Sequence, residues 1–186
     1  MRNDEYIKRI HEEILKVMDE VDRICRENNL QYYLIGGTLL GAVRHEGFIP
    51  WDDDLDIAMP REDYETFLAI SPSALPSHLK IGTARYDVNY HRLFSKVYNV
   101  NTRFVEHVGE KETNMGIFVD IFPLDYSDGY SRFLESRKWF VKKCSTMLSS
   151  KAYPGQLHGI KKNNCKYIVL KTDTENGGVC HETPQK

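Results

Sequence analysis

Four aspartates crowd into the five positions 52–56 of a segment that reads WDDDLD from residue 51. Adjacent carboxylates repel one another and aspartate is a poor strand former, so packing alone does not explain the cluster. A divalent cation would neutralise it, and oxygen ligands of this kind suit Mg²⁺ or Mn²⁺. If a strand runs from Asp54 to Met59, alternation places Asp54 and Asp56 on one side, where both could bind the metal. The alternative for an isolated Asp-x-Asp is a solvated acidic turn.

A glycine turn upstream of the acids argues against that alternative. Gly36-Gly37-Thr38 follows an apolar, tyrosine-rich strand pattern and precedes a short helical pattern. Glycines in such a turn let the backbone come close to a phosphate, and the helix N-terminus presents free N–H groups with partial positive charge. We therefore expect Gly36, Gly37 and Thr38 to bind a substrate phosphate beside the metal, although a glycine pair also serves ordinary tight turns.

A third carboxylate should come from a neighbouring strand. Asp120 is the single charge in the apolar run from Gly116 to Phe122. A buried aspartate needs a partner or a metal, so we expect Asp120 to join Asp54 and Asp56 on one edge of a sheet. Asp125, just beyond this run, is the alternative.

Two basic residues could contact the phosphates of a substrate. Lys96 interrupts a strand pattern, and Arg44 follows the short helix after the glycines. Each could bind a phosphate group, although Lys96 could equally be an outward lysine. Trp51 could stack on a base or a choline, or could be a buried anchor beside the acids.

The elements that must position these residues can be predicted from periodicity. Three-four spacing of apolar residues predicts a long packing helix, and alternation predicts several short strands. The predicted helices are 3–28, 38–45, 60–70 and 130–150. The predicted strands are 30–35, 54–59, 79–83, 93–98, 103–107 and 116–122.

The bulk properties set limits on the class of protein. The 186 residues suit one folded catalytic domain, expected over 1–150, followed by a short atypical tail, 151–186, that is expected to be truncated or partly disordered. The net charge of −2 argues against broad binding to nucleic acid. No signal peptide or membrane span is apparent, and the four cysteines form no Cys-x-x-Cys pair. We expect a cytoplasmic protein with reduced thiols, compatible with peripheral association at the inner face of a membrane.

Two blocks of the sequence resemble the LicD family of phosphorylcholine transferases, which also takes in fukutin and fukutin-related protein. The first reads YLIGGTLLG from Tyr33 to Gly41 and RHEGFIPWDDDLD from Arg44 to Asp56, and the second reads FVDIFPLD from Phe118 to Asp125. The resemblance covers about residues 5–150. It implies an α+β fold similar to the polymerase-beta type of nucleotidyltransferase, with a mixed sheet flanked by helices.

The resemblance also implies an activity. Members of the family move a phosphorylated alcohol, such as phosphocholine, from a CDP carrier to a glycan hydroxyl and release CMP. The implied donor is CDP-choline or a similar CDP-alcohol, and the implied acceptor is a teichoic acid or lipooligosaccharide precursor. Asp54, Asp56 and Asp120 would be the metal ligands, with Asp120 instead or also taking the proton of the attacking hydroxyl. Three alternatives stay open: a true nucleotidyltransferase, a non-catalytic remnant that binds nucleotide or a protein, and a phosphohydrolase with an aspartate nucleophile.

Overall fold

The computed structural model describes residues 3–90, 92–108, 111–126 and 166–169. The helix predicted over 130–150 and nearly all of the tail lie outside these residues. The elements in chain order are α1 (Asn3–Glu27), β1 (Tyr33–Leu34), α2 (Gly36–His45), β2 (Asp56–Pro60), α3 (Arg61–Ala74), β3 (Leu79–Gly82), β4 (Ser95–Asn99), β5 (Arg103–Val108), β6 (Lys111–Met115), β7 (Phe118–Leu124) and β8 (Lys166–Val169).

Five of these strands form a mixed sheet in the order β1-β2-β7-β4-β3. β2 and β7 are parallel, and the other neighbours are antiparallel. A separate three-stranded sheet has the order β6-β5-β8. The mixed sheet with its three helices confirms the predicted α+β class.

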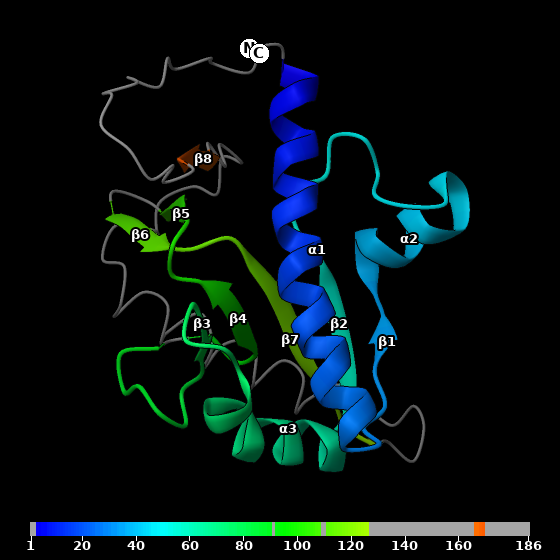
Figure 1. The fold of residues 1–186 in the computed structure, drawn as a ribbon, viewed down its shortest axis with the longest axis vertical. Helices are drawn as coiled ribbons and strands as arrows, with labels where there is room; N and C mark the ends of the chain where they lie inside the picture. Colours follow the sequence, from blue (N-terminus) through cyan, green and yellow to red (C-terminus); the bar gives the residue numbers. More distant parts are fainter. Residues whose placement is uncertain (1–2, 91, 109–110, 127–165, 170–186) are drawn as a thin grey trace, which may run out of the picture.

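The core lies between one face of the five-stranded sheet and the helices α1 and α3. Figure 1 shows α1 crossing in front of β7 and β2, with α3 at one end of the sheet and α2 beside β1 at its edge. The apolar stripe of α1 is buried, as its spacing predicts, and so are the sheet residues that face it. The fully buried members of this stripe and sheet face include Ile10, Ile14, Val17, Val21, Ile24, Ile57, Val97 and Ile121.

Helix α3 corrects one prediction. The predicted helix 60–70 ends too early, because α3 continues to Ala74 with Pro72 inside it. A proline there cannot donate to the carbonyl of Leu68, four residues earlier. The Tyr86 hydroxyl donates to that carbonyl instead, at 2.6 Å, so a residue from another part of the chain fills the gap in the helix.

The start of β2 corrects a second prediction. The strand begins at Asp56, so Asp54 precedes it in an irregular segment and does not belong to the alternating pattern. Leu55 and Ile57 are nevertheless buried. The short helix also begins earlier than predicted, because α2 includes Gly36 and Gly37 as its first residues.

Candidate active site

One row of residues crosses the middle of the five-stranded sheet. Asp56 of β2 is the register partner of Asp120 of β7, and Asp120 is the partner of Lys96 of β4. Register partners on neighbouring strands present their side chains on the same face of a sheet. Asp56, Asp120 and Lys96 therefore share one face, while the next row, which contains Ile57 and Ile121, faces the helical core.

Lys96 and Asp120 form a buried ion pair. The Lys96 side chain is 1% exposed and its Nζ lies 2.9 Å from Asp120 Oδ1 and 3.2 Å from Oδ2. Nζ also lies 3.1 Å from the centroid of the Phe118 ring, which adds a cation–π contact. The outward alternative for Lys96 is therefore wrong, because the strand directs the side chain into the row of acids.

Burial dominates the electrostatics of Asp120. Desolvation raises the pKa of its carboxyl to about 6, although the charge of Lys96 and its hydrogen bond act in the opposite direction. The charge of Asp56 contributes to this rise in the pKa of Asp120, and the charge of Arg92 opposes it. Lys96 directs its hydrogen bond at Oδ2, so the closer Oδ1 accepts no well-directed hydrogen bond from any described residue. A buried carboxylate oxygen that accepts no well-directed hydrogen bond is suited to bind a cation or to accept a hydrogen bond from a ligand.

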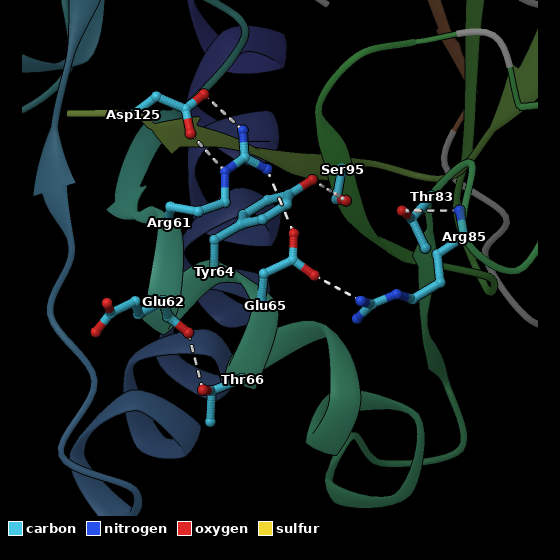
Figure 2. Close-up of polar contacts among 9 residues, drawn as sticks. All are labelled: Arg61, Glu62, Tyr64, Glu65, Thr66, Thr83, Arg85, Ser95 and Asp125. Atoms are coloured by element: carbon cyan, nitrogen blue, oxygen red, sulfur yellow. Dashed lines mark hydrogen bonds and ion pairs between the residues drawn. The ribbon is translucent and has the colours of Figure 1, made fainter. Parts of the chain in front are cut away.

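Asp125, the alternative third carboxylate, lies in a different setting. It follows the end of β7, and both of its oxygens accept hydrogen bonds from Arg61 at 2.7 Å (Figure 2). The hydrogen bond from Arg61 lowers the pKa of Asp125, and the Asp125 side chain is 65% exposed. Five residues of extended chain place it roughly 16 Å along the strand direction from Asp120. Of the two acids, only Asp120 lies in the row with Asp56.

The acidic loop before β2 brings three more carboxylates together. One oxygen from each of Asp52, Asp53 and Asp54 lies within 4.8 Å of the other two, and all three residues are partly buried. The donor set of the loop and the row consists of carboxylate oxygens, which fit a hard divalent cation such as Mg²⁺. The buried Oδ1 of Asp120 adds an oxygen without a directed partner. These residues therefore fit a metal, and the loop adds Asp52 and Asp53 to the predicted candidates.

The glycine turn lies directly against these acids. A Cβ at Gly37 would come within 2.7 Å of Asp52 Oδ2, and a Cβ at Gly36, whose φ is +57°, would lie 3.4 Å from Asp56 Oδ2. The Asp56 N–H donates to Thr38 Oγ1 at 2.8 Å, and the Ile35 N–H donates to the Asp56 carbonyl at 3.2 Å. The turn therefore makes room for two of the protein's own carboxylates at the start of α2, and the binding of a phosphate by the same residues stays a prediction.

Helix α1 anchors the acidic loop from the other side. His11 Nε2 lies 2.6 Å from the carbonyl oxygen of Asp52, and the His11 ring stacks on Phe48 with centroids 4.0 Å apart. The Asp52 N–H donates to the Ile49 carbonyl at 2.9 Å. Sequence reasoning missed His11, because nothing in the periodicity of α1 separates a histidine at the edge of the apolar stripe from an ordinary solvated residue.

Two other sequence candidates lie on the surface. Arg44 is exposed in the last turn of α2, eight residues from Gly36 and thus roughly 12 Å from the helix start. Its contact with a phosphate stays a prediction. Trp51 is 77% exposed, so the expectation of a buried anchor is wrong. The indole lies at the surface next to the acidic loop, where stacking on a ligand remains the untested alternative.

Comparisons with known proteins identify a family and several relatives of this chain. A family model described as LicD/FKTN/FKRP, nucleotidyltransferase domain, matches residues 29–157. The lipopolysaccharide cholinephosphotransferase LicD of Haemophilus influenzae is 35% identical over 113 residues, which cover 60% of this chain and 41% of that protein. An uncharacterized protein of Rickettsia prowazekii is 36% identical over 117 residues, covering 60% of this chain and 39% of that protein.

A shorter match involves the human ribitol 5-phosphate transferase FKRP, which is 53% identical over 34 residues, 18% of this chain and 7% of that protein. The chain matches about 40% of the length of the Haemophilus and Rickettsia relatives. Among the described residues, no helix is long and apolar enough to cross a membrane.

Proposed function

The chain belongs to the LicD/FKTN/FKRP nucleotidyltransferase domain family, and from this premise we propose that it transfers phosphocholine, or a similar phospho-alcohol, from a CDP-linked donor to a glycan hydroxyl. CMP is the second product. The observation that carries the proposal is the row of Asp56, Asp120 and Lys96 beside the acidic loop and the glycine turn. The choice of phosphocholine is supported by the Haemophilus influenzae relative, a lipopolysaccharide cholinephosphotransferase.

The reaction breaks the phosphoanhydride bond of the donor and forms a phosphoester bond to the acceptor. The oxygen of the acceptor hydroxyl attacks the phosphorus that carries the choline, and the bond from that phosphorus to the bridging oxygen of CMP breaks. Mg²⁺ or Mn²⁺ held by Asp54, Asp56 and Asp120 would supply positive charge to the diphosphate oxygens. Asp52 and Asp53 are further candidate ligands.

Asp120 is the residue that we propose for the proton of the acceptor hydroxyl. A pKa of about 6 leaves the carboxylate ionised at neutral pH yet more basic than an ordinary aspartate. Lys96 keeps that carboxylate in place and acts on a substrate through it, because almost none of the lysine is exposed. Gly36, Gly37 and Thr38 would hold a donor phosphate at the start of α2, and Arg44 would approach it from solvent.

The test incubates the protein with CDP-choline, Mg²⁺ and glycan acceptors and follows CMP. We expect Asp54→Asn and Asp56→Asn to reduce CMP release by at least about 100-fold. Each substitution removes a ligand of the metal ion whose charge would stabilise the transition state. Glu62→Gln, an exposed acid on α3, is the matched control and should keep the wild-type rate.

The products separate the remaining classes of function. Release of pyrophosphate from a nucleoside triphosphate in place of CMP would support a true nucleotidyltransferase. Metal-dependent binding of CDP-choline without turnover would support a non-catalytic remnant. A covalent aspartyl-phosphate would support a phosphohydrolase. Wild-type rates in Asp54→Asn or Asp56→Asn would remove that residue from the site.

A further inference from the structure

His11 of α1 bridges the turn that leads into the acidic loop. Its Nε2 atom lies 2.6 Å from the carbonyl oxygen of Asp52, and its ring stacks on Phe48 with the two planes 5° apart. A carbonyl oxygen can only accept, so Nε2 carries a proton and donates this hydrogen bond. One side chain therefore contacts the chain at Phe48 and at Asp52, four residues apart, and fixes the turn between them.

The other end of the acidic loop is fixed by the five-stranded sheet. The Asp120 N–H donates to the Leu55 carbonyl at 2.9 Å, which ties the residue after Asp54 to β7. Asp53 and Asp54 therefore lie between two backbone anchors, one at Asp52 and one at Leu55. The first anchor depends on a side chain of α1, so a substitution in α1 can remove it without altering the loop itself.

Helix α2 contacts the same stretch of chain closely. A Cβ at Gly41 would come within 2.6 Å of the Gly47 carbonyl oxygen and 2.9 Å of the Ile49 nitrogen. Nearer the start of the helix, a Cβ at Gly37 would come within 2.7 Å of a carboxylate oxygen of Asp52. The chain from residue 47 to residue 52 thus runs back along α2, and the histidine contacts it from α1.

Repulsion among the loop carboxylates gives these anchors a role in metal binding. One oxygen from each of Asp52, Asp53 and Asp54 lies within 4.8 Å of the other two. Like charges at this distance repel, which favours loop conformations that move the carboxylates apart. A hydrogen bond that holds the backbone opposes this separation, so the ligands are already close together when a cation binds.

We propose that His11 is a positioning residue for the metal site and keeps the acidic loop in the conformation that binds a divalent cation. Its hydrogen bond goes to the backbone of Asp52, so its effect on the cation is indirect. Loss of such an outer partner typically weakens metal binding by about 10- to 100-fold. The identification of this cation with the cofactor of the transfer reaction rests on the proposed function.

The test measures the affinity of the metal-free protein for Mn²⁺ by electron paramagnetic resonance, without donor or acceptor. His11→Phe keeps a ring that can stack on Phe48 but loses the N–H donor, and it should weaken Mn²⁺ binding about tenfold or more. His11→Gln keeps an N–H donor but loses the ring, and it should recover most of the affinity. Amide exchange of residues 48–54, measured without metal, should be faster in His11→Phe than in the wild type or His11→Gln.

The matched control is Arg23→Met. Arg23 also donates from α1 to a backbone carbonyl, that of Ala74 at the end of α3, at 2.9 Å. The substitution removes this hydrogen bond and the ion pairs of Arg23 with Glu20 and Glu27, yet it should leave the Mn²⁺ affinity unchanged. Thermal melting of each variant checks that the fold is intact.

Wild-type Mn²⁺ affinity in His11→Phe would overturn the proposal, and so would an equal loss in His11→Gln or in Arg23→Met. A wild-type protein that binds no Mn²⁺ would overturn it together with the metal site. CMP release from CDP-choline, measured separately, tests the transfer function. Mn²⁺ binding that depends on the His11 donor, without CMP release, would support the positioning role and contradict the transfer.

Discussion

Asp120, near the start of β7, and Asp125, just after its end, lie in surroundings that shift their pKa values in opposite directions. Asp120 lies inside the sheet, 8% exposed, beside a lysine that is almost completely buried. Asp125 lies five positions later and is exposed, and its two carboxylate oxygens accept hydrogen bonds from Arg61. Burial raises the pKa of Asp120 to about 6, whereas the hydrogen bond from Arg61 lowers the pKa of Asp125.

The difference shows that an ion pair does not by itself fix the proton affinity of a carboxylate. Both aspartates have a cationic partner at hydrogen-bond distance. At Asp125 water keeps solvating the ionised form, so the arginine adds a small stabilisation. At Asp120 the loss of hydration outweighs the lysine, and the carboxylate stays basic and available for a metal or a proton. Substitutions at Asp120 and Asp125 test this contrast.

The largest contrast is expected in catalysis. Asp120→Asn should reduce CMP release by at least about 100-fold, because an amide can neither accept the proton nor bind the metal as a carboxylate does. Asp125→Asn should keep the rate within about twofold, since it lies beyond the other end of the strand. Steady-state assays with CDP-choline measure both. Equal losses in the two variants would mean that the row across the sheet is not the active site.

The next contrast is in the free energy of unfolding. Asp120→Leu leaves the Lys96 charge buried without its carboxylate and should cost about 3–5 kcal/mol. The double variant Lys96→Met/Asp120→Leu should recover most of that loss, because neither charge then remains in the sheet. Urea denaturation at pH 7 without metal gives the values. A double variant no more stable than Asp120→Leu would contradict the buried pair as the source of the loss.

A third contrast concerns pH. The folded pKa of Asp120 is raised above its unfolded value, so the folded state binds the extra proton between about pH 4 and 6. Wild-type stability should therefore fall, by on the order of 3 kcal/mol at most, as the pH rises through this window. Asp120→Asn should lack this decline. Urea midpoints of metal-free protein between pH 4 and 7 measure it, and parallel curves for the two proteins would refute the raised pKa.

The smallest effect is expected at Asp125. Its folded pKa is lowered, so its contribution is present above the unfolded pKa and is lost as the pH falls. Asp125→Asn should lower stability at pH 7 by about 1 kcal/mol or less, and the difference from wild type should shrink near pH 3. Denaturation at both pH values provides the measurement. A loss of about 3 kcal/mol at pH 7 would contradict the small contribution expected of an exposed ion pair.

The sequence could predict Asp120 because its neighbours carry the information. An aspartate inside an apolar strand is expected to be buried, because such a strand runs inside a sheet, and the parallel pairing of β2 with β7 places Asp120 opposite Asp56. The pairing of Lys96 with Asp120 could not be predicted, because a strand pattern gives the alternation of side chains and not the register between strands far apart in sequence. For the same reason the choice between a phosphate contact and an outward side chain stayed open.

The acidic loop was harder to predict because its path is set by tertiary contacts. Asp54 was expected on the strand with Asp56, but the chain becomes extended only at Asp56. The position of Asp52 against Gly37 depends on the return of the loop to the start of α2, which no local pattern encodes.

Helix α1 shows that the segment matched by the family model and the folding unit have different limits. The family match begins at residue 29, after the last residue of α1. Yet this helix supplies much of the buried core and, through His11, holds the carbonyl of Asp52 in the acidic loop. A protein trimmed to the matched residues would retain every carboxylate of the site but lose the scaffold that fixes their loop. Transplanting the chemistry of this chain into another protein therefore requires the preceding helix as well as the motif.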